Sequence, residues 1–163
     1  MSRIGKLPLP IPATVAISVD KSNVVTVKGP KGTLTQAVDP DISIKIEDGV
    51  LTVVRPTEQK RHKALHGLYR SLIANMVKGV NEGYKIDLEL VGVGYKSSLQ
   101  GTSNLELSLG YSHNLVIGLP PEITVSTITE KGKNPIVTLQ GIDKHLIGQV
   151  AAKLRSLREV EPY

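Results

Sequence analysis

The sequence predicts an α+β protein made of two tandem copies of one small fold, each an antiparallel sheet covered by one helix. Two observations carry this prediction. Strand, turn and helix signals in residues 12–80 recur in the same order in residues 83–158, and sliding the first half by 81 positions superposes matching residues. The superposed pairs include Gly29 with Gly110, Leu34 with Leu115, Pro40 with Pro121 and, after a five-residue insertion, Thr52 with Thr138.

The duplication indicates two domains. The first is expected over residues 1–80 and the second over residues 83–163, with a hinge at residues 79–83. The cores must consist of Val, Ile and Leu, because the chain has no Phe or Trp. Such β-branched richness favours strands.

The first copy begins with strand signals. Apolar and polar residues alternate in Ala13–Val19, which is typical of a half-buried strand. The segment Gly29-Pro30-Lys31-Gly32 predicts a hairpin turn with a lysine at its tip. The remaining strands of this copy are expected at Val24–Lys28, Leu34–Val38, Ile42–Ile46 and Val50–Val54, and Pro56 ends the sheet.

A helix follows these strands and is expected over about Glu58–Lys78. Its apolar residues recur at three- and four-residue steps, and Gly79 stands where a helix commonly ends in a glycine. The residues of this stripe are Leu65, Leu68, Leu72 and Met76.

The second copy repeats this order. Asp143 is the expected N-cap of its helix, which is predicted to run to about Arg158. Its strands are expected at Ile86–Tyr95, Leu105–Leu109, Leu115–Ile117, Ile123–Ile128 and Ile136–Leu139.

Composition narrows the class of protein. A net charge of +5 and a pI near 9.4 favour a polyanionic partner, although the excess lies in the first copy. The absence of cysteine excludes disulfides and thiol nucleophiles. No apolar run approaches the roughly 20 residues that span a bilayer, and no signal peptide is evident, so we expect a cytoplasmic protein with no membrane partner.

The second helix carries a candidate binding surface beside its core stripe. At about 100° per residue, small and basic residues share one face. Small residues admit another backbone, and the flanking cations suit phosphate oxygens. An alternative is that Gly148 and Ala151 let the helix sit close to its own sheet. The residues of this face are Lys144, Gly148, Ala151, Arg155 and Arg158.

Two glycine-containing segments are candidates for contact with nucleic acid. Gly92–Lys96 offers an aromatic ring in Tyr95 and a cation in Lys96, which could meet a base and a phosphate. Gly110–Asn114 is similar in kind, with Tyr111, Ser112 and His113. The alternative for the first segment is a β-bulge or a close strand crossing.

Catalytic and metal sites are weakly indicated. His62 and His66 have the spacing of paired zinc ligands, but Lys63 stands where a metalloprotease has its glutamate, and nearby cations oppose a dication. No phosphate-binding loop or nucleophile elbow occurs. We therefore predict no enzyme, no metal and no cofactor.

Five segments resemble bacterial large-subunit ribosomal protein six. They are SRIGKLPLPIP (Ser2–Pro12), VTVKGPKGTL (Val25–Leu34), LVGVGYKSSLQG (Leu90–Gly101), LSLGYSH (Leu107–His113) and GIDKHLIGQVAAKLRSLR (Gly141–Arg158). The resemblance implies a two-domain structural protein of the large ribosomal subunit. It also implies 23S-type rRNA binding near the translation-factor binding region and stalk base, with neighbouring ribosomal proteins and translation factors close by.

The resemblance implies that the second domain makes the main rRNA contacts. The basic tail of the family, expected after Tyr163, is not in this sequence. A free-standing module for another RNA or protein is the alternative function. The residues expected to bind rRNA are Tyr95, Lys96, Tyr111, Ser112, His113, Lys144, Arg155, Arg158, Tyr163, Arg3 and Lys6.

Overall fold

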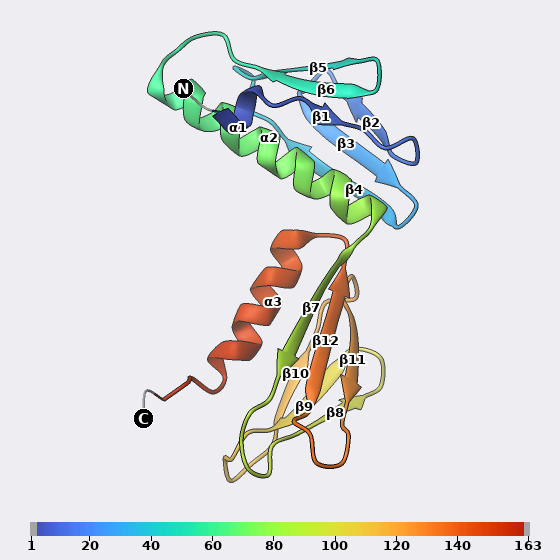
Figure 1. The fold of residues 1–163 in the computed structure, drawn as a ribbon, viewed down its shortest axis with the longest axis vertical. Coiled ribbons are helices and arrows are strands. Elements are labelled where there is room, and N and C mark those ends of the chain that lie inside the picture. The colour runs from blue at the N-terminus through green and yellow to red at the C-terminus, as the bar shows by residue number, and fades with distance from the viewer. Residues whose placement is uncertain (1–2, 162–163) are drawn as a thin grey trace. The chain divides into compact units, whose positions relative to one another are not determined.

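A computed structural model describes residues 3–161 and contains two compact units, Met1–Gly83 and Tyr84–Tyr163. These are called unit 1 and unit 2. Each unit holds two three-stranded antiparallel sheets and a covering helix (Figure 1). The predicted α+β duplication is confirmed, with two small sheets in each copy in place of one.

Unit 1 pairs the sheets β1-β6-β5 and β2-β3-β4 with the long helix α2. A short helix, α1, precedes them. The bounds are α1 Arg3–Lys6, β1 Leu9–Pro10, β2 Ala16–Val19, β3 Val24–Gly29, β4 Gly32–Ala37, β5 Ser43–Glu47, β6 Val50–Val54 and α2 Lys60–Asn81. The hairpin turn at residues 29–32 and the three strands after it are close to prediction, whereas α1 and β1 were missed.

Unit 2 repeats the sheet orders of unit 1, as β7-β12-β11 and β8-β9-β10. Its helix α3 packs against β7 and β12. The bounds are β7 Tyr84–Glu89, β8 Lys96–Gln100, β9 Asn104–Ser108, β10 Leu115–Gly118, β11 Thr124–Ile128, β12 Ile136–Gly141 and α3 Lys144–Ser156. Equivalent strands therefore occupy equivalent places in the two units.

The register of the repeat differs by one residue from the prediction in one strand. In β3 the fully buried residues are Val25 and Val27, and in β9 they are Leu105 and Leu107, a spacing of 80 positions. Because successive strand residues face opposite sides, a slip of one residue would exchange core and surface. The spacing of 81 holds just before β5 and β11, where Ile42 and Ile123 are both buried.

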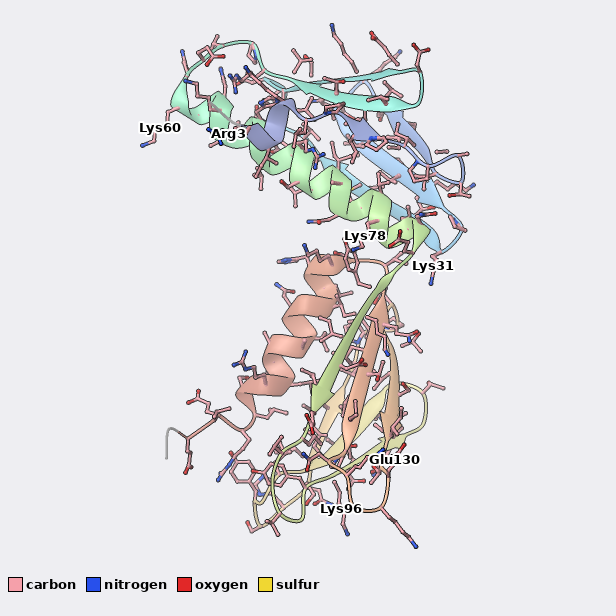
Figure 2. The ribbon with its side chains drawn as sticks, viewed as in Figure 1. Arg3, Lys31, Lys60, Lys78, Lys96 and Glu130 are labelled. Atoms are coloured by element: carbon pink, nitrogen blue, oxygen red, sulfur yellow. The ribbon has the colours of Figure 1, made fainter. Side chains whose placement is uncertain are left out.

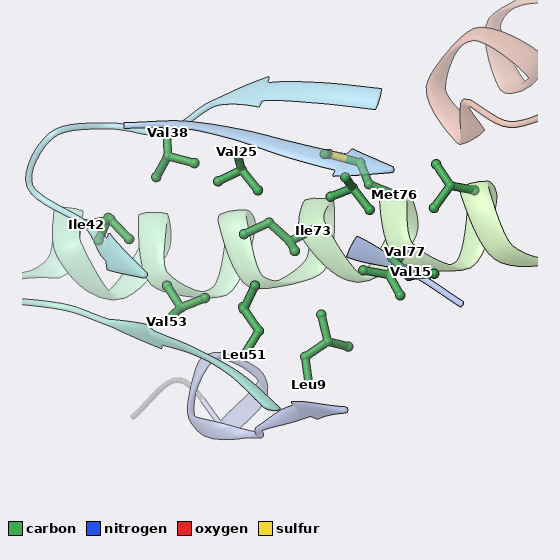
Figure 3. Close-up of a cluster of buried hydrophobic side chains, with 12 residues drawn as sticks. Leu9, Val15, Val25, Val38, Ile42, Leu51, Val53, Ile73, Met76 and Val77 are labelled. Atoms are coloured by element: carbon green, nitrogen blue, oxygen red, sulfur yellow. The ribbon is translucent and has the colours of Figure 1, made fainter. Parts of the chain in front are cut away.

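The core of unit 1 lies between its two sheets and α2. Figure 3 shows Ile73 of the helix between Val25 from one sheet and Leu51 from the other, and Met76 further along the helix in the same cluster. Each Å² of apolar surface that these side chains bury contributes about 25 cal/mol of favourable free energy. This burial stabilises the packing of α2 against the sheets. The predicted stripe is partly wrong, because Leu68 is 50% exposed.

The end of α2 also differs from prediction. Gly79 lies inside the helix and is buried, and the helix ends at Asn81. Gly83 has a φ of +81° and its N–H donates to the carbonyl oxygen of Lys78, 3.3 Å away. Gly83 is therefore the terminating glycine, since this left-handed conformation costs glycine little.

The covering helices α2 and α3 begin differently. Asp143 is the N-cap of α3, as predicted, and its carboxylate accepts a hydrogen bond from the backbone N–H of His145 at 2.9 Å. The N-cap of α2 is Gln59, whose side chain makes no capping hydrogen bond.

No helix within residues 3–161 is long and apolar enough to cross a membrane.

Candidate functional site

Two loops and the end of α3 bring aromatic rings and an arginine together in unit 2. The hydroxyl group of Tyr111 donates a hydrogen bond to the carbonyl oxygen of Leu157, 3.0 Å away. The guanidinium carbon of Arg158 lies 5.2 Å from the centre of the Tyr111 ring, a cation–π distance. The ring of His113 stacks on Tyr111 with centres 6.0 Å apart. Tyr95, Tyr111, His113 and Arg158 are called the tyrosine–arginine cluster.

Two glycines position Tyr95 in this cluster. A Cβ atom added to Gly92 would stand 2.6 Å from Cζ of Tyr95, and one added to Gly110 would stand 3.4 Å from its Cε1. The ring therefore lies directly on the backbone of Gly92 and beside that of Gly110. Gly94 completes the turn with a φ of +77°, and Tyr95 donates its N–H to the Gly92 carbonyl oxygen.

This turn corrects the predicted strand over Ile86–Tyr95. The strand β7 ends at Glu89, and residues 90–95 form a loop before β8. The bulge or strand crossing weighed for this segment is also wrong. The strand β8 was missed because its sequence, Lys-Ser-Ser-Leu-Gln, lacks apolar alternation.

The two arginines at the end of α3 differ in whether they have partners. The pKa of the Arg158 guanidinium is raised above its ordinary value, chiefly by hydrogen bonding to Tyr111, and Glu161 lies 3.7 Å from one of its nitrogens. Arg155, one turn earlier, is exposed and makes no hydrogen bond or ion pair within residues 3–161. Arg155 is therefore available to an external anion.

A cavity of about 780 Å³ opens beside the cluster, entirely within unit 2. It lies between the end of α3 and the sheets. Its lining residues are Asp87, Leu88, Glu89, Leu90, Val91, Tyr95, Leu105, Leu107, Leu109, Val137, Leu154, Arg155, Arg158, Glu159, Val160 and Glu161. Sequence reasoning missed Asp87, Glu89 and Val91, because no motif marks them and only the fold brings them to one opening.

Other predicted residues lie outside the cluster. Lys144 is at the opposite end of α3, about 20 Å from Arg158 at 1.5 Å per residue, with its amine 6.0 Å from the Tyr84 ring centre. Lys96 and Ser112 are exposed in unit 2. Arg3, which Figure 2 labels, and Lys6 are exposed on α1 in unit 1. Tyr163 lies outside the described residues.

The two small residues predicted to share one face of α3 have different surroundings. Ala151 is 8% exposed and packs into the core of unit 2. Gly148 is different, because a Cβ atom added there would meet nothing within 4 Å. The alternative reading, in which Gly148 lets the helix approach its own sheet, is therefore wrong, and this position stays open to an outside partner.

His62 and His66 have structural partners. His66 Nε2 lies 2.8 Å from the carbonyl oxygen of Val53, so this nitrogen carries the proton and Nδ1 accepts from Arg55 at 3.3 Å. His62 lies between Thr57 and Asp41, at 2.7 and 3.3 Å. Within residues 3–161, no group of three potential metal ligands comes together.

Comparison with known proteins defines the class. A family model described as Ribosomal protein L6 matches residues 11–83 and again residues 91–163. The protein is thus a ribosomal protein with two copies of one domain, a structural protein and not an enzyme.

Relatives agree over the whole chain. A Large ribosomal subunit protein uL6 from Cytophaga hutchinsonii is 70% identical, with all of this chain and 88% of that protein covered. Proteins of the same name from Parabacteroides distasonis and Salinibacter ruber are 59% and 52% identical over the same shares. The chain belongs to the ribosomal protein L6 family, as the resemblance predicted.

Proposed function

We propose that this chain is a structural constituent of the large ribosomal subunit that binds 23S-type rRNA mainly through unit 2. The tyrosine–arginine cluster is the observation that carries the proposal. It offers aromatic rings for unstacked bases and the guanidinium of Arg158 for a phosphate, the kinds of group by which single-stranded RNA is recognised. The names of the relatives, which place them in the large subunit, support the same assignment.

The proposal extends to residues outside the cluster. Lys96 and Ser112 lie in the same unit, and Gly148 with Lys144 gives α3 a face that an RNA backbone can approach. Arg3 and Lys6 are proposed as a second contact from unit 1, and Tyr163 as a contact from the tail.

The contacts act together as a scaffold. Phosphate contacts from arginine and lysine supply affinity that falls with salt, and contacts from both units together select a folded RNA shape. We propose that this site lies near the translation-factor binding region and stalk base, beside neighbouring ribosomal proteins.

Sedimentation tests the main contact. The tagged chain should migrate with large subunits in sucrose gradients at moderate salt. The double change Arg155→Ala and Arg158→Ala should release it at lower salt, because two phosphate contacts are lost. A control with Lys131→Ala and Lys133→Ala removes the same charge from the loop after β11 and should leave sedimentation unchanged.

Each result decides between the proposals. Release by both double variants alike would show that net charge, and not the cluster, holds the chain. A wild-type chain that stays at the top of the gradient at low salt would favour the free-standing module.

A chemical probe tests the location. The chain has no cysteine, so Lys131→Cys gives one attachment point for an iron chelate. Hydroxyl radicals from subunits that carry it should cut rRNA in the factor-binding region. Cuts confined to distant rRNA would contradict the proposed location.

A further inference from the structure

The strand β4 of unit 1 is the edge of its sheet and offers free backbone groups. In the described part of the chain β4 pairs only with β3, and it lies next to α2 (Figure 1). Facing residues of an antiparallel pair alternate between hydrogen-bonded and non-hydrogen-bonded pairs. The N–H of Val38 donates to the carbonyl oxygen of Asn23 at 3.0 Å, so Thr33 and Thr35 belong to non-hydrogen-bonded pairs. Their N–H and carbonyl groups point away from β3 and have no partner in residues 3–161.

This edge lacks the features that commonly block a free strand, which are charge, proline and short length. The strand β4 is six residues long, and its sequence, Gly-Thr-Leu-Thr-Gln-Ala, has no charge and no proline. In unit 2 the edge strand β7 carries Lys85, Asp87 and Glu89, and the edge strand β10 has only four residues. The edge of β4 is therefore suited to pairing with another strand.

An apolar flank of α2 borders the same edge. His66 marks the opposite flank, which contacts α1, because its ring lies against Gly5. At about 100° per residue, Leu68 and Leu72 fall on the flank away from α1, where α2 packs against β4. Leu68 is 50% exposed. A strand added to β4 would cover Leu68 with side chains from every second position.

Two lysines lie at the turn end of β4. Lys28 is opposite Thr33 in the neighbouring strand, and Lys31, labelled in Figure 2, is in the turn. The N–H of Lys31 donates to the carbonyl oxygen of Val80 at 3.0 Å, which holds the turn on the end of α2. Neither lysine amine has an ion pair within residues 3–161. These charges favour a carboxylate at this end of an added strand.

We propose that β4 takes an extended segment of a neighbouring ribosomal protein as an added strand. The segment pairs with the backbone of Thr33 and Thr35, places apolar side chains on Leu68 and carries a carboxylate near Lys31. A protein segment fits better than RNA, because a protein backbone alternates N–H donors and carbonyl acceptors at the spacing of the strand. This inference rests on the proposed function and adds to it a protein contact of unit 1.

Cross-linking in purified large subunits tests the inference. The chain has no cysteine, so Thr33→Cys gives one attachment point on β4 for a photo-reactive group. This group should cross-link to one short segment of a single ribosomal protein, which mass spectrometry identifies. Thr52→Cys, at an exposed position of β6, is the control and should not cross-link to that segment. Cross-links only to rRNA, or to a second copy of this chain, would overturn the inference.

A matched pair of variants tests the backbone pairing. Thr35→Pro removes the outward N–H and leaves the bonds between β4 and β3 in place, because proline is tolerated where a strand's N–H points away from its sheet. The cross-link from position 33 should be lost. Thr35→Val keeps the N–H and should keep the cross-link. Equal yields from the two variants would contradict strand pairing.

A second pair tests the apolar flank without changing the strand. Leu68→Glu should lower the cross-linking yield about tenfold, because the added strand would cover a charge that has no partner. Ile46→Glu is the control, since Ile46 is 40% exposed and lies on β5, in the other sheet of unit 1. It should leave the yield unchanged. Equal losses from both variants would remove Leu68 from the contact and overturn the inference.

Sedimentation separates this inference from the proposed function. The Thr35→Pro chain should still migrate with large subunits, because unit 2 makes the main rRNA contact. If the wild-type chain sediments with subunits and its β4 cross-links to no protein, the proposed function stands and this inference fails. A wild-type chain that does not sediment with subunits would refute both.

Discussion

The two covering helices use the same fold differently. By the sequence repeat, His62 and His66 of α2 occupy positions equivalent to Ile147 and Ala151 of α3. Unit 1 places polar rings there, and the ring of His66 lies against Gly5 of α1. Unit 2 has apolar residues at these positions and a shorter helix. One copy is thus closed by its own chain, and the other leaves an opening beside exposed arginine.

The largest effect is expected from changes in the two hydrophobic cores. Ile73 and Ile147 are 0% and 1% exposed, one in each helix. Changing either to alanine should cost about 3 kcal/mol of unfolding free energy, because it removes buried methyl groups and leaves a cavity. Since each unit has its own core, calorimetry of Ile73→Ala should show unit 1 melting earlier and unit 2 unchanged. A single transition that shifts as a whole would contradict two separate cores.

A second test removes the buried histidine ring of unit 1, His66, for which unit 2 has an alanine. His66→Leu should cost about 2 kcal/mol, because the Val53 carbonyl oxygen and the Arg55 guanidinium both lose a buried hydrogen-bond partner. Urea denaturation of the variant measures this loss. His113→Leu, at an exposed position of unit 2, is the control and should cost far less. Equal effects would remove the distinction between the units.

A third test compares the two helix starts. Asp143→Ala should cost about 1 kcal/mol, since the cap of α3 loses its side-chain hydrogen bond. Gln59→Ala should cost little, because the Gln59 side chain makes no such bond. Thermal denaturation of both variants measures the difference. A larger loss from Gln59→Ala would mean that the cap geometry does not set these stabilities.

The smallest expected effect is on the stability of the protein at low pH. In unit 2 the pKa of Glu106 is lowered from its ordinary value of 4.5, chiefly by hydrogen bonds from Asn114 and then Gln100. A lowered folded pKa stabilises the fold above pH 4.5, and this contribution is lost as the pH falls through the folded value. The stability of Glu106→Gln should therefore fall less steeply below pH 4.5. A variant that follows the wild-type curve would show that Glu106 contributes nothing.

Much of the fold could be predicted because hydrophobic periodicity reports local structure. The hairpin at residues 29–32, the strands around it and the cap at Asp143 depend on residues close together in the sequence. Errors came where tertiary contacts decide. Gly79 resembles a terminating glycine, but burial of Val80 carries α2 two residues past it to Asn81. Leu68 fits the helical stripe and is still exposed, because no helix or strand in the described part of unit 1 covers it.

The candidate site was predicted by residue type more than by position. Tyr95, Tyr111, His113 and Arg158 were all expected from sequence, and the structure brings them together. Lys144 was grouped with Arg158 on one face, but the helix separates them along its length. A periodic pattern gives the angle around a helix and says nothing about which end another loop approaches.

The sequence by itself determined the duplication, the α+β class and the family, because these depend on the order of local signals and on motifs read directly from the residues. Only the tertiary structure decided that Gly148 is open, that Ala151 is core and that a cavity lies beside Arg155. Those properties depend on which distant segments of the chain fill the space around a residue, and local sequence signals do not contain that information.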